Sequence, residues 1–109
     1  MLPDPALAQQ ILIERVVAAV HPEKIILFGS RARGDHRPDS DFDILVVMTQ
    51  DVEQPWNLAR DLRRAVGLIG YGKDIVVVDH RRLNNEAGLN GSIIGMALRD
   101  GKQIWPHAA

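Results

Sequence analysis

Residues 25–48 read IILFGSRARGDHRPDSDFDILVVM, and this stretch decides the fold. It contains two runs that are entirely apolar, 25–28 and 44–48, separated by a mostly polar segment. Uninterrupted apolar runs of this length predict strands in a sheet that is covered on both faces. The polar segment is too short to hold a long crossover helix, so we expect the two strands to be antiparallel neighbours.

A third apolar run, 75–78, directly follows Asp74 and predicts a third strand over 74–78. Apolar residues at helical spacing predict a helix over 55–69 between the second and third strands. That helix is long enough for a crossover, so the second and third strands should be parallel. Together these elements predict an α/β (α+β) domain with a small mixed sheet flanked by helices.

The two ends of the chain complete this pattern. Residues 6–20 predict an N-terminal helix with Asp4 as its cap, and Ser92 is expected to cap a last helix that ends near Arg99. The intervening residues 83–91 are rich in Asn and Gly and predict a loop, and the segment 103–105 predicts a short tail.

Composition limits the classes of function. The chain has 109 residues and a mass of 12.1 kDa, so we expect one domain over 1–109. Thirteen basic and fourteen acidic side chains give a net charge of −1, which disfavours direct binding to nucleic acid. The absence of cysteine excludes a disulfide scaffold, cysteine zinc sites and thiol catalysis. Neither a membrane-spanning run nor a secretory signal is recognisable, so a cytoplasmic location is expected.

The predicted topology brings acidic residues together at one edge of the sheet. Asp41 and Asp43 lie two apart at the start of the second strand, so both carboxylates should leave the same face. Asp74 begins the neighbouring parallel strand at the same edge. Three clustered carboxylates suit one or two Mg²⁺ ions, and Asp74 is also a candidate base for an acceptor hydroxyl.

The first strand ends at a phosphate-binding signal. Gly29 and Ser30 follow it directly, and the next residues can form a helical turn whose N–H groups would face an anion. Arg33 is a further candidate for nucleotide binding, whereas Arg31 is expected to be a surface charge. A phosphate site that faces a metal site is the arrangement that a nucleoside triphosphate requires.

The pair of segments Gly29-Ser30-Arg31-Ala32-Arg33-Gly34 and Ser40-Asp41-Phe42-Asp43 resembles the signature of the polymerase-β-type nucleotidyltransferases. The chain looks most similar to their minimal nucleotidyltransferase (MNT) branch, and the likeness covers nearly its whole length. The resemblance implies a polymerase-β-like fold with catalytic, metal-binding carboxylates at Asp41, Asp43 and Asp74. It also implies nucleotide binding by Gly29, Ser30 and Arg33.

The resemblance further implies a partner. Members of this branch are commonly paired with a HEPN-domain toxin, so the chain would be an antitoxin that transfers AMP from ATP to a tyrosine of that toxin. Larger relatives carry a second domain for the acceptor; this chain has no room for one, so another protein must hold or be the acceptor.

Two other functions stay open at this point. The chain could neutralise a toxin by occlusion alone, with its catalytic residues idle, or add nucleotides to RNA, which the neutral charge balance disfavours. Nucleotide preference and homo- or hetero-oligomeric state are not predicted.

Overall fold

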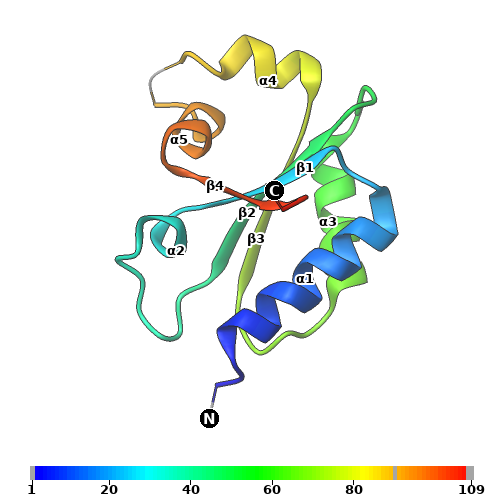
Figure 1. Ribbon diagram of the computed structural model, residues 1–109. Helices are drawn as coiled ribbons and strands as arrows, with labels where there is room; N and C mark the ends of the chain where they lie inside the picture. The colour runs from blue at the N-terminus through cyan, green and yellow to red at the C-terminus, as the bar shows by residue number, and fades with distance from the viewer. Residues whose placement is uncertain (1, 90, 108–109) are drawn as a thin grey trace.

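A computed structural model describes residues 2–89 and 91–107 of the chain (Figure 1). Five helices and four strands follow one another along the chain: α1 (Pro5–Val20), β1 (Lys24–Phe28), α2 (Ser30–Arg33), β2 (Phe42–Met48), α3 (Pro55–Val66), β3 (Lys73–Asp79), α4 (His80–Glu86), α5 (Ile93–Asp100) and β4 (Lys102–Trp105). Among the described residues, no helix is long and apolar enough to cross a membrane.

The four strands form one mixed sheet in the order β3-β2-β1-β4. Strand β2 pairs antiparallel with β1 and parallel with β3, and α3 provides the crossover between β2 and β3. The predicted α/β class, the small mixed sheet and both strand orientations are therefore confirmed.

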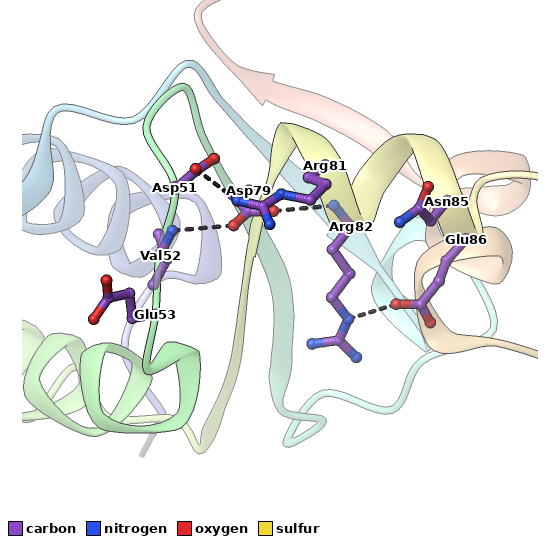
Figure 2. A pocket seen from close by; sticks show the side chains of 8 residues that line it. All are labelled: Asp51, Val52, Glu53, Asp79, Arg81, Arg82, Asn85 and Glu86. Atoms are coloured by element: carbon purple, nitrogen blue, oxygen red, sulfur yellow. Dashed lines mark hydrogen bonds and ion pairs between the residues drawn. The ribbon is translucent and has the colours of Figure 1, made fainter.

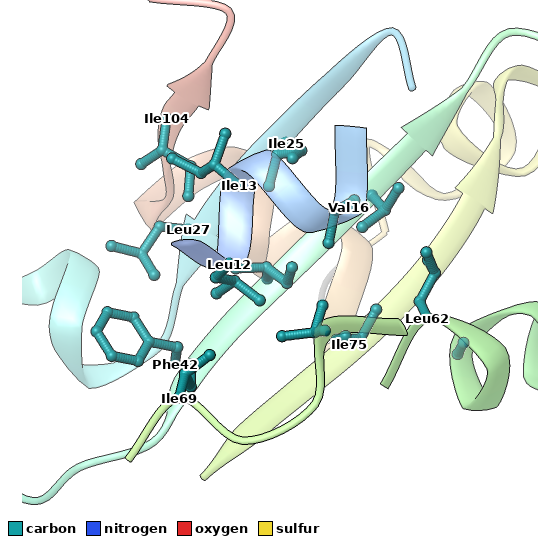
Figure 3. Packing of buried hydrophobic residues seen from close by; sticks show 14 of the residues in the cluster. Leu12, Ile13, Val16, Ile25, Leu27, Phe42, Leu62, Ile69, Ile75 and Ile104 are labelled. Atoms are coloured by element: carbon teal, nitrogen blue, oxygen red, sulfur yellow. The ribbon is translucent and has the colours of Figure 1, made fainter. Parts of the chain in front are cut away.

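Both faces of the sheet are buried, as the uninterrupted apolar runs predict. Successive side chains of a strand point to opposite faces. In β2, Phe42 (Figure 3) and Ile44 therefore pack into the core beneath α1 and α3. Helices α4 and α5 lie on the other side of the sheet (Figure 1), where Leu45 and Val47 pack. Each of the four is at most 1% exposed, so the middle strand is fixed from both sides.

The predicted helix caps are also confirmed. The Asp4 carboxylate accepts a hydrogen bond from the backbone N–H of Ala6 at 3.0 Å at the start of α1. The Ser92 hydroxyl accepts from the backbone N–H of Gly95 at 2.8 Å at the start of α5. Both bonds satisfy N–H groups that have no partner inside the helix.

Two segments differ from the sequence expectation. The expected loop 83–91 is only partly loop: its first four residues, 83–86, belong to α4, which begins where the Asp79 carboxylate accepts from the backbone N–H of Arg82. Asn90 lies outside the described residues. The expected tail 103–105 is part of strand β4, because Ile104 is buried in the core and the segment pairs with β1. Helix α3 also ends earlier than expected, at Val66.

Candidate active site

The candidate site lies where β1 ends and where β2 and β3 begin. Phe28, the last residue of β1, is the register partner of Asp43 in β2. Asp43 is in turn the register partner of Asp74 in β3. Residues directly opposite in a parallel pair share a face of the sheet, so the two carboxylates leave it side by side. The sequence predicts this pairing of Asp43 with Asp74 as part of a cluster of three carboxylates.

Gly29 forms the corner between β1 and α2. Its backbone angles, φ 73° and ψ −157°, lie in a region that residues other than glycine rarely adopt. A Cβ atom at this position would also overlap the Asp43 carboxylate. The glycine therefore allows the chain to turn into α2 while its backbone stays pressed against Asp43.

The electrostatic setting of Asp43 favours a bound cation. The side chain is half-buried, and the pKa of its carboxyl is raised above the ordinary value, first by burial and then by the negative charges of Asp74 and Asp41. The nearby positive charge of Arg33 opposes this rise in pKa. A carboxylate that is destabilised by desolvation and by like charges is stabilised when a divalent cation joins the group.

A second close contact joins Asp41 and Gly72. The register pairs Phe42 with Lys73, so Asp41 and Gly72 precede matching positions at the starts of β2 and β3. A Cβ atom on Gly72 would overlap the Asp41 carboxylate. In the sequence Gly72 reads only as a helix breaker; alignment of the two strand starts is the signal that would reveal its role.

Arg31 supports the segment that leads into Asp41. Its guanidinium donates to the carbonyl oxygens of Ser40, at 3.0 Å, and Pro38, at 3.2 Å. It also lies 4.3 Å from the ring centroid of Phe42 and 5.0 Å from that of Tyr71. The expectation of a mere surface charge is therefore wrong: Arg31 is half-buried and fixes the loop between α2 and β2.

Ser30 and Arg33 lie at the two ends of the short helix α2. Gly29 is the N-cap of α2, so Ser30 is its first residue and its hydroxyl does not cap the helix. The first N–H groups of a helix have no partner within it and suit an anion. Arg33 is exposed and forms an ion pair with Asp35 at 3.2 Å.

The donor chemistry of the three carboxylates fits a hard divalent cation. Among residues 2–89 and 91–107, no three His, Cys, Asp or Glu side chains are gathered tightly enough to hold a metal ion by themselves. Magnesium is usually held by one or two carboxylates together with substrate phosphates, rather than by an all-protein cage. The arrangement therefore fits a cation that arrives with a phosphate-bearing substrate.

Two pockets lie near β3, at different distances from this site. One has a volume of about 490 Å³ and is lined by the loop after β2, by Asp79 at the end of β3 and by α4 (Figure 2). Its walls carry the ion pairs Arg81–Asp51 and Arg82–Glu86. The other, of about 330 Å³, includes Asp74 among its lining residues. Only the second pocket therefore adjoins the candidate site.

Comparison with known proteins shows which family this region belongs to. Residues 10–90 match the family described as "Nucleotidyltransferase domain". Over 84 residues the chain is 37% identical to "putative protein adenylyltransferase MJ0604" from Methanocaldococcus jannaschii, which corresponds to 76% of this chain and 78% of that relative.

Solved structures share the architecture. A "putative nucleotidyltransferase" from Sulfolobus solfataricus superposes with a TM-score of 0.64 at 23% identity, over 91% of this chain and 78% of that chain. A chain of the complex of tri-AMPylated Shewanella oneidensis HEPN toxin with MNT antitoxin superposes with a TM-score of 0.51 at 26% identity. That match covers 92% of this chain and 71% of the other. The first likeness supports the fold alone.

Proposed function

The chain belongs to the nucleotidyltransferase domain family, and from this premise we propose that it is a magnesium-dependent protein adenylyltransferase. In this proposal it transfers AMP from ATP to a tyrosine hydroxyl of a HEPN-type toxin, and thereby acts as an antitoxin. The relative named as a protein adenylyltransferase supports the reaction, and the likeness to the HEPN–MNT complex supports the partner.

The observation that carries the proposal is the position of Asp43 between two other elements of the site. Asp43 lies against the backbone of Gly29 on one side and opposite Asp74 on the other. In the proposal, the phosphates of ATP bind at the N–H groups and hydroxyl of Ser30, next to this pair of carboxylates. Arg33, whose charge already acts on Asp43, would add a cation on the phosphate side.

Asp41, Asp43 and Asp74 would hold the magnesium that accompanies ATP. When bound, the metal would neutralise the phosphates and stabilise charge on the attacking and leaving oxygens. Gly29 and Gly72 leave space for the carboxylates of Asp43 and Asp41, so these two groups are positioned by the backbone.

In the proposed reaction, the tyrosine oxygen attacks the α-phosphorus of ATP. A bond forms between that oxygen and phosphorus, the bond from the α-phosphorus to the bridging oxygen breaks, and pyrophosphate leaves. The phenolic proton passes to Asp74, which is one of the residues that line the adjoining pocket. Most of the rate enhancement would come from orientation and charge stabilisation.

Mass spectrometry of a HEPN-type protein from the same organism, co-expressed with this chain, tests the proposal. The wild-type chain should add AMP to a tyrosine of that protein, and Asp43→Asn should abolish the addition. Asp61→Asn, an exposed acidic position on α3, is the matched control and should behave as wild type. If Asp43→Asn still neutralises the toxin without modifying it, the function is occlusion and the transferase proposal is wrong.

A further inference from the structure

The pocket beside Asp74 runs along the free edge of the sheet. Four consecutive residues of the edge strand β3, 74–77, line it, and helices α3, α4 and α5 contribute its walls. Side chains of consecutive strand residues point alternately to the two faces. A pocket that all four of them line therefore follows the strand edge rather than one face of the sheet.

The walls of this pocket are largely apolar and include an aromatic ring. Trp56 on α3 is 85% exposed and Ile93 on α5 is 51% exposed, and both line the pocket together with buried Ile94. Four charged side chains share the lining: Asp74 and Arg63, and the ion pair of Arg82 with Glu86 on α4. Apolar walls that stand beside a small number of charged groups are typical of a site for a ring-bearing ligand.

The position of the pocket indicates which of the two substrates it can bind. In the proposed function the phosphates lie at Ser30, after β1, and the sheet order places β2 between β1 and β3. Displacement at phosphorus requires the attacking and leaving oxygens to be roughly in line on opposite sides. If pyrophosphate leaves on the β1 side, the acceptor oxygen must arrive on the β3 side, where Asp74 lies.

We infer that this pocket binds the aromatic side chain of the acceptor tyrosine and directs its phenol oxygen to Asp74. This inference rests on the proposed function. A tyrosine ring packs against Trp56 and Ile93, and its polar tip reaches the carboxylate that takes its proton. The positive charge of Arg63 on the pocket wall favours the oxygen as it loses that proton. A serine or threonine hydroxyl would leave the apolar walls unfilled.

Nuclear magnetic resonance of the full chain tests the inference with two probes. N-Acetyltyrosinamide should shift the indole N–H signal of Trp56 and leave that of Trp105, on β4, unchanged. A non-hydrolysable ATP analogue with magnesium should instead shift the amide signals of Gly29 and Ser30. Trp56→Ala should weaken tyrosinamide binding about tenfold, the loss expected for one aromatic contact, without changing the affinity for the ATP analogue.

Leu68→Ala is the matched control, because Leu68 is an apolar side chain that is 96% exposed and lies outside the pocket lining. This variant should bind both probes as wild type does. The inference is overturned if tyrosinamide leaves the Trp56 signal unmoved up to its solubility limit. It is also overturned if Trp56→Ala weakens the ATP analogue, because the pocket would then hold the adenine base. Loss of analogue binding at Gly29 and Ser30 contradicts the proposed function instead.

Discussion

Gly72 lies so close to Asp41 that a single added Cβ atom would overlap the Asp41 carboxylate. The contact joins the start of β3 to the start of β2, where the backbone N–H of Phe42 also donates to the carbonyl oxygen of Gly72 at 3.0 Å. An ordinary turn glycine therefore determines where a candidate catalytic side chain can lie.

Gly72→Ala should reduce AMP transfer about 100-fold, because displacement of a positioning group by about 1 Å can cost that much in rate. Its φ is not positive, so the free energy of unfolding should change little. Gly88→Ala is the control, since a Cβ there meets no atom within 4 Å. Transfer rates and urea denaturation of both variants check this; a Gly72→Ala enzyme with wild-type rate would contradict the proposed position of Asp41.

Alanine substitutions at Gly29 and Gly34 distinguish the effect of backbone strain on stability from the effect of a clash with the candidate site on ATP binding. Both have positive φ, 73° and 85°, but only at Gly29 would a Cβ overlap a carboxylate, that of Asp43. Gly34→Ala should lose about 1 kcal/mol of stability and keep its affinity for ATP. Gly29→Ala should lose about 1–3 kcal/mol and also lose ATP binding. Equal effects of the two substitutions on ATP affinity would show that the contact with Asp43 has no functional role.

Substitution of Arg31 should mainly lower stability, whereas substitution of Arg33, two residues away, should mainly lower the affinity for ATP. Arg31→Ala removes two hydrogen bonds and the contacts with the Phe42 and Tyr71 rings, so the free energy of unfolding should fall by about 1–3 kcal/mol. Arg33→Ala removes only an exposed ion pair and should change stability by less than about 0.5 kcal/mol. Chemical denaturation and ATP titration check both; ATP affinity should fall in Arg33→Ala even though its fold is intact.

Asp79 gives the fold a measurable pH dependence. Its carboxylate accepts from the backbone N–H groups of Arg82 and Val52, both at 3.0 Å (Figure 2), and these bonds lower the pKa of Asp79. A lowered folded-state pKa means that the stabilisation is present above the unfolded pKa and is lost as pH falls through the folded one. Asp79→Ala should therefore cost about 1–2 kcal/mol at neutral pH, and the difference from wild type should shrink below about pH 4.

Asp79→Asn is the control for that titration, because it keeps an acceptor oxygen that does not ionise in this range. Denaturant unfolding of wild type and both variants at a series of pH values measures the effect. A gap between wild type and Asp79→Ala that stays constant into acid would show that the ionised carboxylate is not what holds the start of α4.

Much of the site could be predicted because it depends on local pattern and strand order. The apolar runs of β1, β2 and β3 fix their burial on both faces, and the length of α3 fixes the parallel pairing. These two facts are sufficient to bring Asp43 and Asp74 into register beside Gly29.

The features that sequence reasoning missed depend on tertiary contacts. Strand β4 exists because its segment pairs with β1 and buries Ile104, although it looks like a tail when read alone. Arg31 is a charged residue on a polar loop in the sequence, and only the folded chain places it over Phe42. The role of Gly72 likewise requires the register between two strands that are separated by α3.

Isothermal titration of a non-hydrolysable ATP analogue, with and without magnesium, tests the central claim most directly. The claim is that Asp41, Asp43 and Asp74 act with the Gly29 corner as one metal-dependent nucleotide site. Wild type should bind the analogue only when magnesium is present, and Asp43→Asn should not bind it. Asp43→Asn should stay folded, since it removes a carboxylate whose pKa is raised by burial and by its acidic neighbours. Binding of equal affinity in the chelator EDTA, or in a folded Asp43→Asn variant, would contradict the claim.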